Sequence, residues 1–364
     1  MTEHNPEGLT TRLTIMLLVA MYFITLGFMQ TAMAADKTYV GWAVGSNTGG
    51  YGLILHSGDG GNTWTRQGGV STIPDVSLSA VAAIDENNCW IVGSRSGGYG
   101  TILRTTDGGK TWGRQGSPAT IPDADLLKIY VLDKNTAWVV GNPRAILFTN
   151  DGGNTWFSKV TADVPNVLLQ GVYALDVDNV WVTGYVNNDR ETVLRTTDGG
   201  LNWINKGASE QHFPDTLSLY MLDVSAPDSS TAWACGNGVT VIRTIDNGTT
   251  WSRSYPPVAN DANSIHGFDA ENAWVVTDSD GIFRTTDGGL SWNQQSPEQT
   301  NSYLLSICVL NTDIAWVAGT GIGSGVIHHT IDGGANWQKQ YTTEVGLVGI
   351  SFIAVDTQLP YTGK

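Results

Sequence analysis

A motif of the form Ser/Thr-x-Asp-x-Gly-x-x-Trp recurs seven times along the chain and constrains its fold more than any other feature. We call each copy an aspartate turn; the first is Ser57–Trp64. Self-similarity at a period of about 20 to 50 residues is the signature of a repeat architecture. The protein is therefore a tandem array of one structural unit. The turn aspartates are Asp59, Asp107, Asp151, Asp198, Asp246, Asp287 and Asp332, spaced 41 to 48 residues apart.

A second tryptophan lies upstream of each aspartate turn, in an apolar stretch of the form Trp-x-x-Gly in most copies. Together with the turn tryptophans, these residues account for all 14 tryptophans of the protein. No tryptophan is left over for a dedicated ligand cage. The upstream residues are Trp42, Trp90, Trp138, Trp181, Trp233, Trp274 and Trp316.

Each unit contains four candidate strands, which the third copy illustrates. They are Leu126–Leu132, Thr136–Val140, Ala145–Thr149 and Thr155–Lys159, separated by Gly, Asn and Asp clusters. Short runs rich in Val, Ile, Leu and Trp between such clusters are typical of antiparallel β-structure. A unit of about 45 residues with four strands has the size of one propeller blade. The sequence therefore predicts an all-β, seven-bladed β-propeller of four-stranded antiparallel blades.

The two ends of the repeat region indicate how the ring closes. The first copy begins at a second strand, Val40–Gly45, whereas Leu347–Ile353 follows the seventh turn and matches the first-strand pattern. We expect these strands to share one blade, because closure removes exposed sheet edges. The propeller would span residues 39–356, and residues 357–364 would be a short tail or a truncated continuation. Pro360 argues against a strand of an eighth copy there.

The chemistry of the aspartate turn indicates a structural role. Its carboxylate is expected to accept hydrogen bonds from backbone N–H groups one to three residues ahead, while the glycines supply positive φ and the tryptophan packs on the sheet. A calcium loop would need more acidic oxygens than one copy offers. No Cys/His spacing fits zinc. We therefore expect neither a metal nor a cofactor.

The first residues have the features of an export signal. Arg12 precedes the apolar run Leu13–Phe28, and Ala32-Met33-Ala34 supplies the small residues that a signal peptidase requires. Residues 1–34 are therefore predicted to be a signal peptide that is removed after Ala34. An uncleaved membrane anchor is the alternative, although the run is short for a span. Either way the protein is expected to be exported: periplasmic, on the cell surface or secreted.

Charge and cysteine content narrow the possible partners. The formal net charge is −15 with no basic cluster to offset it, which disfavours nucleic acid and anionic lipid. Membrane association would require a partner or an uncleaved signal. Cys89, Cys235 and Cys308 lie in apolar strand patterns, and their odd number leaves at least one outside any intramolecular disulfide. We expect them to be small buried hydrophobic residues.

The aspartate turns resemble those of Asp-box, or bacterial neuraminidase repeat (BNR), proteins. A turn in every blade, combined with the Trp-x-x-Gly strand, looks most like the photosystem II stability/assembly factor type of propeller. The resemblance covers about residues 39–356 and is specific for fold rather than function. It implies a non-enzymatic scaffold that docks on membrane-protein intermediates during their assembly. The sequence departs from that family in lacking a conspicuous arginine patch, so a general assembly or adhesion role is the safer expectation.

Four arginines occur three residues before a turn aspartate, and this fixed register favours a structural role over a binding role. They are Arg104, Arg195, Arg243 and Arg284. The alternative function is a glycoside hydrolase, sialidase-like or glycan-binding propeller, because sialidases carry similar boxes. The sequence has no Arg-Ile-Pro motif and no assignable nucleophile and base, so we expect the protein not to be an enzyme. A carboxylate pair about 5 to 10 Å apart on the loop face would favour hydrolysis.

Binding is expected on the face opposite the aspartate turns, where the loops between the second and third strands vary. We predict a monomer that presents this face to a protein partner or a surface glycan. The repeated Gly-Gly-Tyr-Gly of the first two blades lies there, at 49–52 and 97–100. The candidate contact residues, none expected to be catalytic, are Tyr51, Arg95, Tyr99, Arg144, Tyr185, Arg190, His212 and Phe213.

Overall fold

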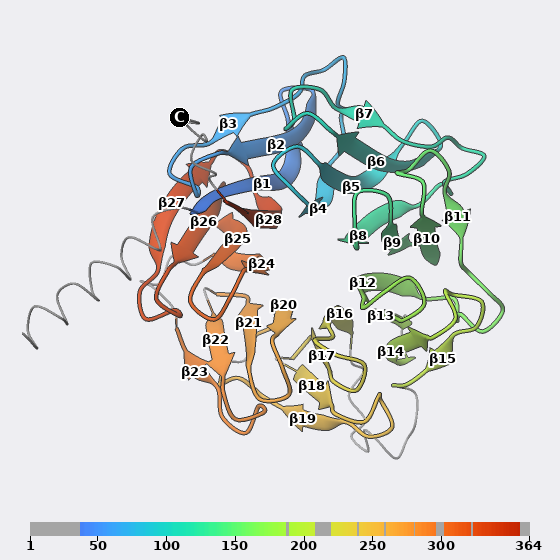
Figure 1. Ribbon diagram of the computed structural model, residues 1–364, viewed down its shortest axis with the longest axis vertical. Coiled ribbons are helices and arrows are strands. Elements are labelled where there is room, and N and C mark those ends of the chain that lie inside the picture. The colour runs from blue at the N-terminus through green and yellow to red at the C-terminus, as the bar shows by residue number, and fades with distance from the viewer. Residues whose placement is uncertain are drawn as a thin grey trace, which may run out of the picture. The chain divides into compact units, whose positions relative to one another are not determined.

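The computed structural model describes residues 37–186, 189–207, 220–238, 240–257, 260–279, 281–295, 302–321 and 323–356. The regular elements of these residues are all strands, which form seven four-stranded antiparallel sheets. The sheets are arranged as blades around a central axis (Figure 1). The predicted seven-bladed propeller is therefore confirmed, and it occupies the compact unit Tyr39–Ile353. The predicted signal peptide (1–34) and tail (357–364) lie outside the described residues.

The blades follow one another along the sequence. Blade 1 contains β28 (Leu347–Asp356), β1 (Lys37–Thr48), β2 (Tyr51–Ser57) and β3 (Thr65–Arg66). Blades 2 and 3 contain β4 (Leu78–Ala83), β5 (Cys89–Ser96), β6 (Tyr99–Thr105), β7 (Gly113–Arg114), β8 (Asp125–Val131), β9 (Ala137–Asn142), β10 (Ala145–Thr149) and β11 (Phe157–Ser158). Blades 4 and 5 contain β12 (Leu168–Ala174), β13 (Val180–Val186), β14 (Asp189–Thr196), β15 (Ile204–Asn205), β16 (Met221–Ser225), β17 (Ala232–Gly236), β18 (Thr240–Thr244) and β19 (Ser252–Ser254). Blades 6 and 7 contain β20 (Ala262–Gly267), β21 (Ala273–Thr277), β22 (Ile282–Thr285), β23 (Asn293–Gln294), β24 (Tyr303–Val309), β25 (Ala315–Gly321), β26 (Ser324–Thr330) and β27 (Gln338–Thr343).

The ring closes through a strand from the end of the repeat region. β28 is the innermost strand of blade 1 and pairs with β1, so segments about 300 residues apart in the sequence share one sheet. Phe352 of β28 stacks on Trp316 of blade 7 at 3.9 Å and meets Trp64 of blade 1 edge-on at 5.7 Å. The expected closure of the ring by residues 347–353 is thus present.

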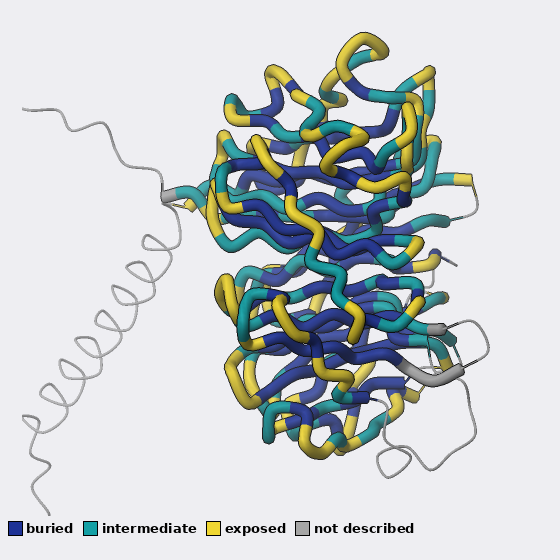
Figure 2. The backbone as a smooth tube through the Cα atoms, turned by 90° about the vertical axis from the view of Figure 1, so that its right-hand side faces the viewer, coloured by how far each residue is buried: buried dark blue, intermediate teal, exposed yellow. Residues whose placement is uncertain are grey.

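The hydrophobic core lies between blades rather than within one of them. One buried cluster joins Trp90 and Val92 of blade 2 to Leu126, Val139 and Trp156 of blade 3. A side view shows the buried residues running along the stacked strands, with exposed residues concentrated in the loops (Figure 2). Each blade therefore buries its faces against its two neighbours, as a repeat architecture requires.

Tryptophans form the repeated contact between blades. The second-strand tryptophan of one blade meets the turn tryptophan of the next edge-on: Trp90 and Trp156 have centroids 5.8 Å apart and an interplanar angle of 88°. Edge-to-face geometry is favoured because the positive ring edge faces the negative ring face. The same contact recurs between Trp138 and Trp203, Trp181 and Trp251, Trp233 and Trp292, and Trp274 and Trp337.

The innermost strands of blades 2 to 7 carry a β-bulge near their start, which turns one side chain toward the axis. In blade 3 the register shifts between Leu126 and Lys128, and in blade 5 between Met221 and Asp223. The residues inside these bulges line a central cavity of about 380 Å³. They include Ser79, Leu127, Gln170, Leu222, Asn263 and Leu305.

Hydrogen bonds define each aspartate turn. In the second turn, Asp107 accepts from the Thr111 backbone N–H at 2.9 Å, from the Thr111 hydroxyl at 2.6 Å and from the Thr105 hydroxyl at 2.8 Å. A donating backbone N–H lies four residues ahead in all seven turns, one residue beyond the expected range of one to three. The reason is that two consecutive glycines, Gly108 and Gly109, both take positive φ and lengthen the turn. Within the expected range, the Leu201 N–H, three residues ahead, also donates to Asp198 at 3.1 Å.

The cysteines are free thiols in apolar surroundings. Cys89 and Cys235 are buried, and Cys308 is partly buried. Burial raises the pKa of the Cys308 thiol to about 11, which keeps it protonated at neutral pH. Across the described part of the protein, no helix could span a membrane, and no group of three or more His, Cys, Asp or Glu side chains is placed to hold a metal ion.

We expect Trp90→Ala to lower the free energy of unfolding by about 3–5 kcal/mol, because it leaves a cavity and removes the contact with Trp156. Urea denaturation followed by far-ultraviolet circular dichroism measures this change. Leu290→Ala serves as the control, since that side chain is 90% exposed and its loss should change stability by less than about 0.5 kcal/mol. Similar values for both variants would contradict the inter-blade core.

The aspartate turns should make the fold sensitive to acid. Hydrogen bonds from Thr111 lower the pKa of Asp107 to about 2, and those from Asn202 lower the pKa of Asp198 to about 2. Unfolded aspartates titrate near pH 3.9, so the unfolded state takes up protons first as the pH falls. The melting temperature should therefore drop between about pH 4 and pH 2. Asp107→Asn should be less stable at pH 7 but show a shallower drop; an equal slope would argue against the turns.

Candidate binding rim

The loop face of blades 1 and 2 carries two matching hairpins. The β1–β2 hairpin turns through Gly49 and Gly50, with φ of 63° and 83°, and Thr48 pairs with Tyr51. The β5–β6 hairpin turns through the corresponding glycines, Gly97 and Gly98, at 62° and 82°. Two-residue turns with positive φ at both positions match the twist of the flanking strands. The Gly-Gly-Tyr-Gly repeat therefore builds the same tight hairpin twice.

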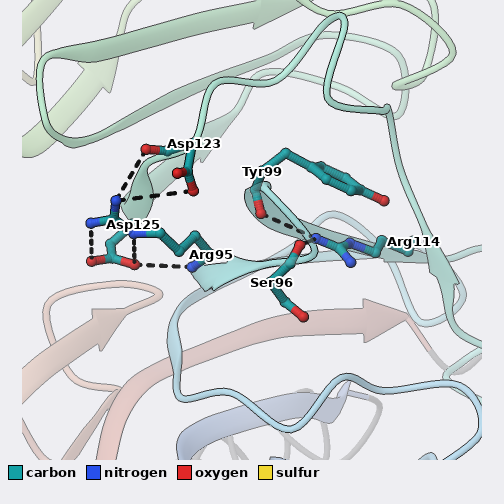
Figure 3. A network of polar contacts seen from close by, with 6 residues as sticks. All are labelled: Arg95, Ser96, Tyr99, Arg114, Asp123 and Asp125. Carbon is teal, nitrogen blue, oxygen red and sulfur yellow. Dashed lines mark hydrogen bonds and ion pairs between the residues drawn. The ribbon is translucent and has the colours of Figure 1, made fainter.

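An arginine from the outer strand supports the tyrosine of each hairpin. The Arg114 guanidinium lies 3.7 Å from the Tyr99 ring centroid and donates to the backbone carbonyls of Ser96, at 2.5 Å, and Tyr99, at 3.1 Å (Figure 3). In blade 1, Arg66 lies over Tyr51 at the same 3.7 Å. Cation–π and hydrogen-bond contacts thus hold each partly exposed tyrosine in one orientation.

Side chains also tie these hairpins to the segments between blades. Arg95 donates to Asp125, with its Nη2 3.1 Å from Oδ2, and to the backbone carbonyl of Asp123 at 3.2 Å (Figure 3). The hydrogen bond from Arg95 lowers the pKa of Asp125. In blade 1, Asn47 makes the equivalent tie to Asp75 at 2.8 Å. The hairpins are therefore braced laterally and cannot swing freely.

Arg144 extends this surface into blade 3. It lies in the β9–β10 turn with φ of 27°, where its backbone N–H donates to the Val167 carbonyl at 3.3 Å. Its Nη2 donates to the Thr161 carbonyl at 2.6 Å. We call this surface the binding rim: the hairpins 46–51, 94–99 and 141–145 together with the segments 74–76 and 122–125.

The rim contains four of the predicted contact residues: Tyr51, Arg95, Tyr99 and Arg144. Tyr185 lies in blade 4, with its ring centroid 4.3 Å from that of Tyr220. Arg190 is part of β14, but its side chain lies outside the described residues, as do His212 and Phe213 entirely. The predicted set is therefore divided, and its blade 4 members remain predictions.

Sequence reasoning missed Arg66 and Arg114, which support the two tyrosines. Both lie seven residues after a turn aspartate, Asp59 and Asp107, on strands of two residues each. The signal was present in the repeat register together with the Gly-Gly-Tyr-Gly loops. It also missed a partly buried ion pair between blades 3 and 5, in which Lys128 of β8 contacts Asp223 of β16 at 2.9 Å.

The arginines three residues before a turn aspartate lie away from the rim. Each guanidinium lies over the tryptophan of the paired strand, for example Arg104 over Trp90 at 4.7 Å. Arg104 also donates to the Gly152 and Lys134 carbonyls of the next blade, the latter at 2.8 Å. In Arg104, Arg243 and Arg284 such contacts are structural links to the next blade.

Fold and rim together define a repeat propeller that collects tyrosine and arginine on the hairpins of one face. A family model described as photosynthesis system II assembly factor YCF48 matches residues 71–165 and 257–344, half of the protein. The chain belongs to this family. No curated protein sequence matches it significantly.

Solved structures share the fold at low sequence identity. A structure of YCF48 bound to a D1 peptide is 19% identical, with a TM-score of 0.57 over 76% of this chain and 92% of that chain. YCF48 from Cyanidioschyzon merolae is 21% identical, with a TM-score of 0.57 over 74% and 87%. Virginiamycin B lyase from Staphylococcus aureus is 15% identical, with a TM-score of 0.58 over 73% and 84%. These likenesses show the propeller fold and nothing finer.

We expect Arg114→Lys to loosen the β5–β6 hairpin selectively, because lysine keeps the charge but loses the planar guanidinium that lies over the Tyr99 ring while its Nη2 donates to both carbonyls. Amide hydrogen exchange of residues 96–99 should become about tenfold faster, equivalent to ~1.4 kcal/mol. Arg66→Lys is the matched control and should affect residues 48–51 instead. Faster exchange throughout the propeller would show that these arginines stabilise the whole fold rather than their own hairpins.

Proposed function

We propose that this protein is an exported, non-catalytic assembly-type scaffold that holds a segment of a protein partner on the binding rim. The main support for this proposal is the pair of matched hairpins, in each of which an arginine holds a tyrosine in place. Tyrosine and arginine are enriched at the centres of protein interfaces. A rigid aromatic side chain loses little entropy on binding, so prior fixation favours affinity.

Family membership supports a protein as the partner. The chain belongs to the YCF48 assembly-factor family, and one solved YCF48 structure has a D1 peptide bound. The net charge of −15 repels nucleic acid, whereas the rim residues Arg95 and Arg144 and the supporting Arg66 and Arg114 gather on one face. We therefore propose a peptide segment with polar or acidic groups beside aromatic or apolar ones. Export rests on the signal pattern of residues 1–34, and the proposal places the partner outside the cytoplasm.

The carboxylates of the rim do not favour hydrolysis. Asp123 and Asp125 both approach Arg95, at 4.0 Å and 3.1 Å. Glycoside hydrolysis requires a carboxylic acid whose pKa is raised so that it donates a proton. The hydrogen bond from Arg95 lowers the pKa of Asp125 instead. This pair is suited to bracing the rim, which supports the non-catalytic proposal.

Photo-crosslinking in living cells tests the proposal. A photoreactive phenylalanine analogue at Tyr99 should trap a defined envelope protein, identified by mass spectrometry. The same analogue at Leu290, which is 90% exposed and lies in the aspartate turn of blade 6, is the control position and should not trap that protein. Equal trapping at both positions, or recovery of polysaccharide alone, would contradict a rim that binds protein.

Binding of the trapped partner should then depend on both tyrosines. We expect the double variant Tyr51→Ala/Tyr99→Ala to raise the Kd of the purified pair at least tenfold, equivalent to about 1.4 kcal/mol. Isothermal titration calorimetry measures the change, and Leu290→Ala should leave the Kd unaltered. A Kd that stays within about twofold of the wild-type value would place the partner elsewhere on the propeller.

A further inference from the structure

One aspartate turn departs from the others at the residue after its aspartate. Six turns have glycine there, whereas the fifth has Asn247, with φ of 59°. In the third and seventh turns this glycine makes room for an arginine of the preceding blade. A Cβ on Gly152 would lie 2.6 Å from Arg104 Nη1, and one on Gly333 would lie 2.9 Å from Arg284 Nη1. Arginine and glycine are thus matched across these blade boundaries.

Arg195 is the corresponding arginine of blade 4, and the turn that it faces has Asn247 in place of the glycine. Arg284 Nη1 donates to the Gly333 carbonyl at 3.0 Å, and Arg104 Nη1 donates to the Gly152 carbonyl. Arg195 makes no such bond to the fifth turn among the described residues; its Nη2 contacts Asn179 Oδ1 at 3.4 Å. The side chain is only 3% exposed, yet its Nε and Nη1 lack acceptors within the described structure. The Nε also lacks an acceptor in Arg104, Arg243 and Arg284, the arginines at the same position of other blades. The unpaired Nη1 distinguishes Arg195 from these three.

A small pocket lies where the arginine and the turn fail to meet. Its volume is about 200 Å³, and its lining includes Arg195, Asp198, Asn202, Lys206 and Asn247. The Asn247 amide oxygen is buried in this region without a donor among the described residues. Buried polar groups are normally paired, so the unpaired donors of Arg195, which lines this cavity, indicate a missing acceptor. The Asn247 oxygen is itself an acceptor and is not a group that such a partner would satisfy.

The chemistry of the lining selects an anion that accepts hydrogen bonds. Arg195 and Lys206 supply two positive charges, and burial disfavours an uncompensated guanidinium, as the lowered pKa of Arg195 reflects. Asp176 offsets part of the Arg195 charge. Asp198 competes little, because its oxygens already accept from the Asn202 side chain at 2.7 Å and the Thr196 hydroxyl at 2.8 Å.

We propose that this pocket, on the aspartate-turn side of blades 4 and 5, binds a single carboxylate group. Planar carboxylates match guanidinium donors, and the limited volume admits one such group rather than a whole sugar or nucleotide. The group belongs to a bound protein, as either an acidic side group or the terminal carboxylate of its last residue. The site is separate from the binding rim and does not rest on what the rim binds.

Indole resonances provide a direct readout. Trp181 lies 4.6 Å beneath the Arg195 guanidinium and meets Trp251 edge-on at 5.9 Å. The Trp251 indole N–H donates to the Lys206 carbonyl at 3.0 Å. Occupation of the pocket should therefore shift both indole N–H signals in nuclear magnetic resonance spectra of the ¹⁵N-labelled protein.

The titration uses three small probes at constant ionic strength. N-acetyl-glutamate N-methylamide presents the carboxylate of an acidic residue, N-acetyl-glycylglycine presents a terminal one, and N-acetyl-glutamine N-methylamide is the neutral control. We expect saturable shifts from at least one carboxylate, with a Kd of about 1–10 mM, and none from the control. The tighter of the two carboxylates identifies the source. No shift up to about 50 mM, or equal shifts from the neutral probe, overturns the proposal.

Asn247→Gly is the decisive variant because it restores the glycine found in the other turns. The Arg195 guanidinium should then dock on the turn carbonyl, as Arg284 does, and carboxylate affinity should fall at least tenfold while the melting temperature stays equal or rises. Lys206→Gln should weaken binding without changing the turn. Unchanged affinity in Asn247→Gly overturns the proposal, and its preserved melting temperature separates loss of the site from loss of the fold.

Discussion

Edge-to-face contact between tryptophans of neighbouring blades is the interaction on which this propeller depends. No blade buries its own faces, so each is stable only when its tryptophans pack against the next sheet. At the junction of blades 7 and 1, a phenylalanine lies between the two tryptophans. There Phe352 stands between Trp316 and Trp64, stacking on one and meeting the other edge-on. The ring therefore needs its closing strand for side-chain packing as well as for backbone pairing.

The arginines on the two faces of the ring make different kinds of contact. On one face, the seven turn aspartates accept hydrogen bonds within their own turns, and most of the arginines three residues before a turn aspartate link adjacent blades. On the other, arginines fix tyrosines without covering them fully. An arginine therefore makes different contacts depending on its position in the repeat. Arg104 and Arg114, ten residues apart, belong to opposite faces and to opposite roles.

The sequence predicted the repeat, the seven blades and the closing strand, because these depend on spacing and on apolar patterning. It predicted the rim only in part. Tyr51 and Tyr99 were found through their loops, whereas Arg66 and Arg114 reach the rim from outer strands, which requires knowledge of how the strands stack laterally. The ion pair between Lys128 and Asp223 joins blades 3 and 5 past the intervening blade 4, and no local sequence pattern encodes such a contact. The mismatch between Arg195 and Asn247 lies between two blades, so the pattern of a single repeat does not reveal it.

The position of β28 affects the order in which the blades of the propeller can be completed. Blade 1 lacks its innermost strand until residues 347–353 have joined it, yet this blade carries Tyr51 and its supporting Arg66. Blades 2 to 7 are each contiguous in the sequence, so the strands of each can come together as the polypeptide is synthesised. The half of the rim in blade 1 is therefore completed last. The blade that carries this half of the rim is therefore complete only when strands from both ends of the propeller have met.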